Sequence, residues 1–109
     1  VAAGTDVEHA VLKNDRKIKI TGAKIASHAA VTANATNYVT IAVKNGATTV
    51  ASITTATTGL TAKTFRDITI TAANQEVASA STLTLSFAHS GTGVAISNAV
   101  LQLAYEVLD

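Results

Sequence analysis

The histidines come first among residues that can do chemistry, because imidazole binds metal ions and transfers protons near neutral pH. The chain has three, His9, His28 and His89, and it has no cysteine. They lie far apart and lack the short spacings that are typical of metal sites. We therefore expect surface or subunit-contact histidines, and we predict no metal site and no cofactor. Histidines gathered at an oligomer axis would instead allow ion binding or pH sensitivity.

Other catalytic patterns are incomplete. Serine, histidine and aspartate are all present, but the Gly-x-Ser-x-Gly motif of a nucleophile elbow is not. The segment Gly91-Thr92-Gly93 resembles part of a phosphate-binding loop, but it lacks the following Gly-Lys-Ser/Thr and leads into a predicted strand. Nothing in the spacing of Asp67 and Glu76 indicates a carboxylate pair. We predict no catalytic residues and no enzymatic activity.

Binding is the alternative to catalysis. Tyr38 and Tyr105 could stack on a sugar ring, as in carbohydrate-binding sandwiches. Tyr38, Asp67 and Glu76 meeting in one cleft would favour this alternative or an enzyme. The net charge of +1 is too small for a nucleic-acid surface, since phosphate contacts need a clear cationic excess. No run of 18 or more apolar residues is present, so we predict no membrane span.

Alternation of apolar and polar residues predicts the elements that would position these side chains. The expected strands number about eight and cover residues 6–12, 17–27, 38–44, 48–55, 64–71, 76–77, 82–90 and 94–108. Such regular spacing is typical of an antiparallel sandwich or barrel. Residues 98–106 could also be read as a helix, but their alternation favours a strand. The 109 residues fit one domain.

Two local signals fix details of these strands. Gly22 interrupts the second strand and predicts a bulge that lets Ala23 and Ile25 continue the buried row. Asn45-Gly46 predicts a hairpin over residues 38–55 with a type I′ turn. Alternation predicts that Leu83, Leu85 and Phe87 point inward, and that Arg66, Ile68 and Ile70 share one face of their strand. In the last strand the expected buried row is Ala99, Leu101, Leu103, Tyr105 and Val107.

Several of these runs together resemble a known family. Residues 33–46 read Ala-Asn-Ala-Thr-Asn-Tyr-Val-Thr-Ile-Ala-Val-Lys-Asn-Gly, and residues 83–88 read Leu-Thr-Leu-Ser-Phe-Ala. The pattern is similar to small β-sandwich proteins of tailed bacteriophage virions, which serve as head-decoration, cement or fibre proteins. The resemblance covers residues 33–107. The closing Leu-Glu-Tyr-like motif departs here to Leu103-Ala104-Tyr105-Glu106.

The resemblance implies a jelly-roll-like sandwich over residues 17–109 and a homotrimer on the capsid exterior. Its partners would be further copies of the chain and the lattice of the major capsid protein, and the chain would be made in the bacterial host cytoplasm. Residues 1–16 would be an N-terminal arm, which anchors on the lattice or exchanges with a neighbour, or a first strand. A tail or baseplate component and a carbohydrate-binding surface module remain the alternatives.

Contacts in such an assembly are expected on two strands. Val100, Ala104 and Leu108 form an apolar row opposite the expected buried row of the last strand, and Val7, His9 and Val11 share a face of the first strand. Exposed apolar rows of this kind mark subunit or lattice interfaces. Alternatively, the row on the last strand packs under a loop.

Overall fold

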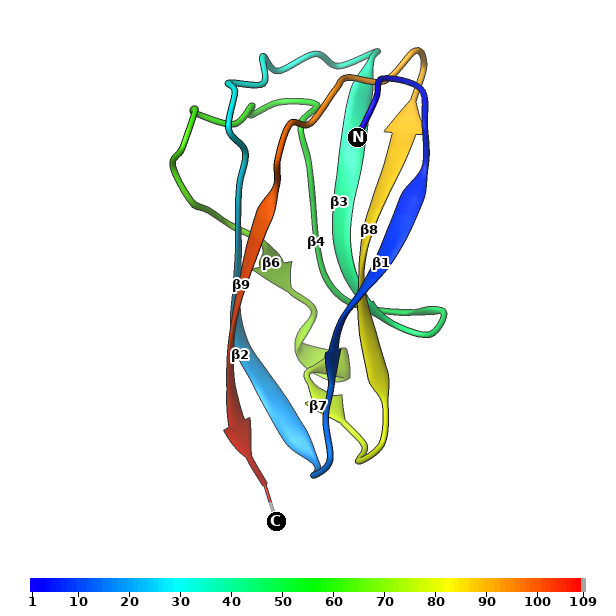
Figure 1. Ribbon diagram of the computed structural model, residues 1–109, viewed down its shortest axis with the longest axis vertical. Coiled ribbons are helices and arrows are strands. Elements are labelled where there is room, and N and C mark those ends of the chain that lie inside the picture. The colour runs from blue at the N-terminus through cyan, green and yellow to red at the C-terminus, as the bar shows by residue number, and fades with distance from the viewer. Residues whose placement is uncertain (109) are drawn as a thin grey trace.

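A computed structural model describes residues 1–108 and shows two antiparallel β-sheets packed face to face (Figure 1). The strands are β1 (Val7–Lys13), β2 (Ile18–Ala26), β3 (Tyr38–Asn45), β4 (Thr48–Thr54), β5 (Arg66–Asp67), β6 (Thr69–Ile70), β7 (Glu76–Val77), β8 (Thr82–Ser90) and β9 (Val100–Val107). A 3₁₀ turn, η1 (Ala72–Asn74), precedes β7. The antiparallel all-β sandwich that alternation predicted is confirmed.

The strand order sets the two sides of the sandwich. The five-stranded sheet has the order β1-β8-β3-β4-β6. In the four-stranded sheet β2 pairs with β9 along one edge and with β5 and β7 along the other. One side of the sandwich is therefore bounded by β1 and β9, and the opposite side by β6 and β5.

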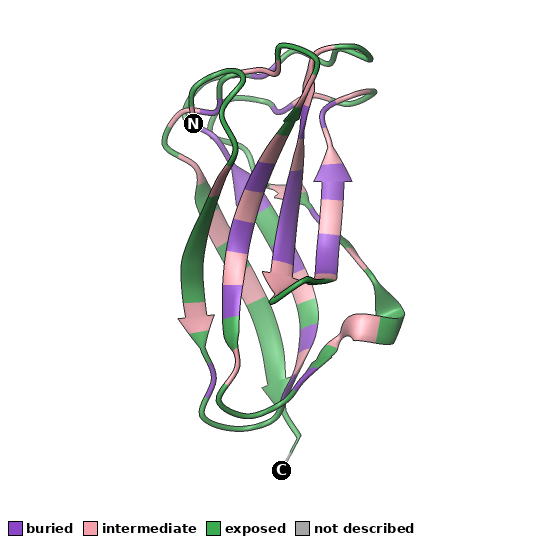
Figure 2. Cartoon of the chain, turned by 90° about the vertical axis from the view of Figure 1, so that its right-hand side faces the viewer, coloured by how far each residue is buried: buried purple, intermediate pink, exposed green. Residues whose placement is uncertain are grey.

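The core lies between the sheets and follows the predicted alternation in β8. Leu83, Leu85 and Phe87 are buried and the residues between them are less so, which gives the banded strands of Figure 2. The largest fully buried side chains are Ile20, Ile25, Ile41, Leu83 and Ile96. These aliphatic side chains pack well on pleated surfaces, so the core needs few aromatics.

A bulge in β2 lets the two parts of this strand keep facing the core. In β2 the register shifts between Ile20 and Gly22, and Ala23 and Ile25 are buried beyond it, as predicted. The hairpin over residues 38–55 is also confirmed. Its turn differs from the type I′ prediction, because Asn45 pairs with Thr48 and the connection is Gly46-Ala47. Only Gly46 has a positive φ, of 61°, whereas a type I′ turn needs two.

The expected strand over residues 64–71 is broken, because the chain changes sheets at Ile68. β5 pairs with β2, and β6 pairs with β4 in the other sheet. The buried Ile68 lies between them and donates its N–H to the carbonyl of Ala23 at 2.8 Å. Arg66 does not share a core face with Ile68, since its Nη1 donates to the carbonyls of Thr54 and Thr58 at 3.1 and 2.7 Å. This crossing segment covers one side of the sandwich.

The last run is shorter and more exposed than alternation predicted. Residues 94–99 are irregular, and β9 begins at Val100. In the row expected to be buried, Leu101 and Leu103 are only half-buried, while Tyr105 is 49% and Val107 51% exposed. The prediction of a fully buried row was wrong because β9 is an edge strand with nothing packed over its second half. The strand that leads to the C-terminus is accordingly green over most of its length (Figure 2).

The N-terminal residues lie against their own chain. The α-ammonium of Val1 donates to the carbonyl of Ile96 at 2.6 Å, and the Ile96 N–H donates back to the carbonyl of Val1 at 2.9 Å. Residues 7–13, within the segment predicted as an arm or a first strand, form β1 and pair with β8. β1 thus becomes one wall of the open side described below.

Candidate functional site

The three histidines occupy separate places. His9 lies on β1 at a groove between the sheets, and His28 follows β2 beside a second hollow. His89, near the end of β8, contacts Asp6. Within residues 1–108 no group of three or more His, Asp or Glu side chains is placed to hold a metal ion.

Asp6 and His89 form a polar contact that fixes the start of β1 on β8. The Oδ1 atom of Asp6 accepts the backbone N–H of His89 at 2.8 Å and lies 2.6 Å from its Nδ1 atom. The backbone hydrogen bond, together with the side-chain bond, stabilises the carboxylate and lowers the pKa of Asp6 below its usual 3.8. Because Asp6 is at the surface, this contact holds a strand end in place and forms no enclosed reactive pair.

The residues of the carbohydrate-binding alternative do not converge. Tyr38 begins β3 in the five-stranded sheet, whereas Asp67 and Glu76 lie in the other sheet. Asp67 is opposite Lys24 and Glu76 is opposite Lys19, at different ends of β2. Each carboxylate also pairs with a lysine, Asp67 with Lys24 at 3.7 Å and Glu76 with Lys17 at 3.2 Å. The cleft that would favour a carbohydrate-binding module or an enzyme is not formed by these three side chains.

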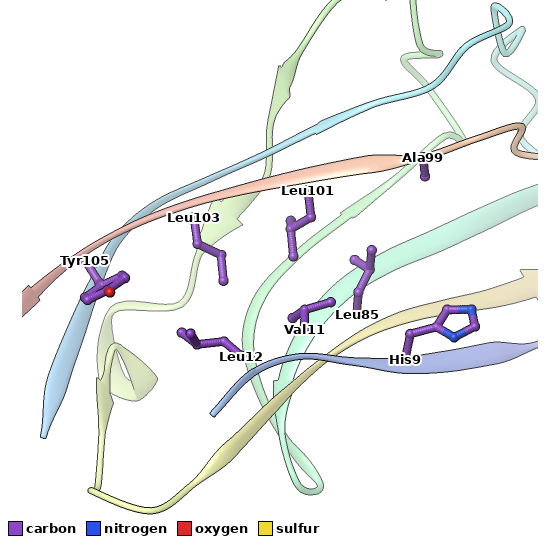
Figure 3. Close-up of a pocket in the computed structure, with 8 residues that line it drawn as sticks. All are labelled: His9, Val11, Leu12, Leu85, Ala99, Leu101, Leu103 and Tyr105. Atoms are coloured by element: carbon purple, nitrogen blue, oxygen red, sulfur yellow. The ribbon is translucent and has the colours of Figure 1, made fainter. Parts of the chain in front are cut away.

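The most developed surface feature is an apolar groove along the open side, between β1 and β9. It has a volume of about 540 Å³. Its lining residues are His9, Val11, Leu12, Leu85, Ala99, Leu101, Leu103 and Tyr105 (Figure 3). Figure 3 shows the leucines of β9 and the side chains of β1 reaching toward each other across it. Most of the lining side chains are aliphatic, and His9 and Tyr105 are the members with polar atoms.

A bulge explains why β1 gives this groove two consecutive apolar side chains. The β1–β8 register shifts between Ala10 and Leu12, so Val11 is the extra residue. Val11 and Leu12 therefore both reach the groove instead of pointing to opposite faces (Figure 3). No glycine marks this bulge in the sequence, and alternation alone could not have found it.

The six predicted contact residues fall into two groups. On β1, His9 and Val11 line the groove, while Val7 is half-buried against the core. The remaining three lie on the other face of β9, where Val100 is 55% exposed, Ala104 is exposed, and Leu108 just beyond the strand is 40% exposed. The open side therefore presents apolar side chains both inside and outside the sandwich.

Sequence reasoning missed the groove row of β9 as a surface and missed Asn14 altogether. The buried Asn14 side chain donates from Nδ2 to the carbonyls of Arg16 and Ala78, at 2.9 and 2.7 Å. It thereby ties the β1–β2 turn to the segment before β8. The available signal for the groove row was the absence of lysine and proline from residues 100–107, which leaves an edge strand unprotected.

A second hollow of about 320 Å³ lies near the start of β9. It is lined by Ala26, Ser27, His28, Lys63, Phe65, Asn98 and Val100. Phe65 is 46% exposed there, which adds to the apolar surface around β9.

Comparison with protein-family models, with curated proteins and with solved structures found no match to this chain. Among residues 1–108 there is no helix with the length and apolar character needed to cross a membrane.

Proposed function

We propose that this chain is a structural component of a tailed-bacteriophage virion, a capsid decoration or cement protein that binds the outer capsid surface and stabilises the head. The observation that carries the proposal is the open side of the sandwich, where two edge strands present mostly apolar side chains around a groove. The resemblance of residues 33–107 to virion sandwich proteins supplies the class.

The exposed apolar surface suits an assembly role. Its large members are Val11, Phe65, Val100, Tyr105, Val107 and Leu108, each at least 40% exposed. Five of these six are on β1, on β9 or just beyond it, and apolar residues gathered in this way mark interaction surfaces. A decoration protein binds its lattice through many repeated weak contacts, so a modest apolar surface on each copy is sufficient.

The two alternatives differ in how well they fit the structure. A tail or baseplate component would use the same surface and differs only in its place on the virion. A carbohydrate-binding module is disfavoured because Tyr38, Asp67 and Glu76 lie apart.

Cosedimentation tests the proposal. The purified chain is mixed with undecorated capsids, and separately with tails, of the phage that encodes it. We expect saturable binding to capsids and a higher temperature of DNA release from decorated heads. Val11→Ser, on the open side, should weaken binding, whereas Thr48→Ser, at the β3–β4 hairpin tip, should not.

Binding to tails alone would transfer the chain to the tail component. A chain that stays in the supernatant with both fractions would overturn the virion proposal.

A further inference from the structure

The edge of β9 differs from the other sheet edges in having no protection. β5, β6 and β7 are short, with bounds of Arg66–Asp67, Thr69–Ile70 and Glu76–Val77. β1 carries a bulge, and its sequence includes Glu8 and Lys13. β9 runs from Val100 to Val107 without a bulge of its own, and its one charged residue is Glu106. Long, flat, apolar edges of this kind recruit another strand.

The hydrogen bonds between β9 and β2 show which residues of β9 point their backbone N–H and C=O groups toward β2. The N–H of Leu108 donates to the carbonyl of Lys17 at 2.9 Å, so Leu108 faces β2. Residues of an antiparallel strand alternate in direction, so Glu106, Ala104 and Gln102 also face β2. On β2, Ile20 is the partner of Tyr105, and its N–H points away from β9 and donates to the carbonyl of Gln75. The backbone groups of Ile20 and Tyr105 therefore do not bond to each other, as the alternation requires.

The backbone groups of the groove row therefore point to the open edge. The residues concerned are Leu101, Leu103, Tyr105 and Val107, and within the described chain β9 pairs with β2 alone. Their side chains are also the ones that the sandwich leaves half-buried or exposed. One added strand would satisfy both the hydrogen-bonding groups and the apolar row.

We propose that this strand is β9 of a second copy of the chain, paired antiparallel about a two-fold axis at Ala104. Leu101 then lies opposite Val107 of the second copy, and Leu103 opposite Tyr105. These are the residues with outward backbone groups, so each pair exchanges both backbone hydrogen bonds. The two four-stranded sheets join into one, and the apolar rows of the two grooves become continuous.

The outer face of β9 is complementary to itself in this register. Gln102 lies opposite Glu106, so an amide N–H meets the carboxylate and no like charges face each other. Val100 lies opposite Leu108, which brings together two exposed apolar side chains. Ala104 faces its own copy in a pair without backbone hydrogen bonds, where side chains approach most closely and a methyl group fits.

Neighbouring registers lose this complementarity. Centred on Leu103, the pairing places Glu106 against Val100. Centred on Tyr105, it places Glu106 against Ala104 and Gln102 against Leu108. The self-match at Ala104 therefore favours a second copy over an unrelated strand, in an isologous contact that closes as a dimer.

The first test is the mass of the protein in solution by light scattering over a range of concentrations. We expect two protomers, in place of the three that the family resemblance implies. Ala104→Lys should weaken the association at least tenfold, because it places like charges together at the axis. Ala10→Lys, a matched exposed alanine on β1, should leave the mass unchanged. Far-UV circular dichroism checks that both variants are folded.

Two substitutions at one position separate pairing from monomer stability. Gln102 faces Lys24 within its own chain and Glu106 of the second copy in the proposed dimer. Gln102→Lys should tighten the dimer roughly threefold to tenfold while slightly destabilising the monomer, and Gln102→Glu should do the reverse. A stability effect alone would move both readouts in the same direction.

Cross-linking tests the register in otherwise native protein, since the chain has no cysteine. Ala104→Cys should form an intermolecular disulfide on mild oxidation, because Cα atoms in such a pair lie about 4.5 Å apart. Gln102→Cys, off the axis, should not. A monomer at every concentration, or a trimer that Ala10→Lys disrupts and Ala104→Lys does not, would overturn the proposal. The pairing needs no capsid, so its failure is distinguishable from a failure of capsid binding.

Discussion

The two sides of the sandwich are built from similar sequence patterns and end in opposite states. On the β5–β6 side, the chain crosses between the sheets and buries Ile68 to 2% exposure. On the β1–β9 side the described chain joins the sheets only at the two ends of the sandwich, through residues 14–17 and 91–99 (Figure 1). Tyr105, which alternation also placed in a buried row, is 49% exposed there. Burial thus depends on whether another segment covers the row.

The hydrogen bonds show the same contrast. On the closed side, backbone groups are satisfied within the chain, for example between Ile68 and Ala23 and between Thr71 and Val50, both at 2.8 Å. On the open side, the outward groups of β9 face solvent in a single copy. The closed side therefore contributes to the stability of the single chain, and the open side leaves backbone groups exposed for the pairing proposed above.

The largest expected effect is the difference in stability cost between truncating one large side chain on the closed side and one on the open side. Ile68→Ala should lower the free energy of unfolding by about 2–5 kcal/mol, because it leaves a cavity in a closed core. Tyr105→Ala should cost the monomer less than about 1 kcal/mol, since the ring is half exposed. Urea unfolding at concentrations below the association range measures both. Equal losses would mean that the open side is closed in solution within a single copy.

A smaller loss of stability is expected at Asn14, whose side chain joins the β1–β2 turn to the segment before β8. Asn14→Ala leaves the carbonyls of Arg16 and Ala78 without their donor and should lower the free energy of unfolding by about 1–3 kcal/mol. Asp15→Ala, exposed in the same turn, is the matched control and should change it by less than about 0.5 kcal/mol. Equal free energies of unfolding for the two variants would mean that the Asn14 hydrogen bonds do not stabilise these turns.

Hydrogen exchange can sharpen the difference between the two edges of β9 itself. In dilute protein the amide of Tyr105, which faces outward, should exchange at least about tenfold faster than that of Glu106, which faces β2. Rising concentration should slow Tyr105 selectively. Uniform protection along β9 at every concentration would contradict the assigned backbone direction.

The smallest effect is the pH dependence at the start of β1. Because the pKa of Asp6 is lowered in the folded state, the folded chain binds this proton less readily than the unfolded chain. The stabilisation is complete above the unfolded pKa of about 3.8 and is lost as the pH falls through the lowered folded value. Asp6→Asn should reduce this loss, as measured by urea midpoints at about pH 5 and about pH 3. An equal drop in urea midpoint between the two pH values for the unmodified chain and for Asp6→Asn would show that Asp6 does not cause the pH dependence.

Local features of the fold could be predicted well from the sequence. The alternation of Leu83, Leu85 and Phe87, the bulge at Gly22 and the hairpin over residues 38–55 all appear in the structure. Each depends on residues within a few positions of one another. Of the predicted contact residues on β1, His9 and Val11 line the groove and Val7 packs against the core, and their role in contacts stays a prediction. The groove and the edge position of β9 were not visible in the sequence.

The sequence by itself determined where strands form and which side chains share a face, because period-2 alternation is a property of neighbouring residues. Tertiary structure alone decided that the chain changes sheets at Ile68, that Asn14 joins two turns, and that β9 is an uncovered edge. The physical reason is that covering a face requires pairing between distant segments, such as β1 with β8 or β2 with β9. The same alternation therefore gives a buried core row in β8 and a half-buried to exposed row in β9.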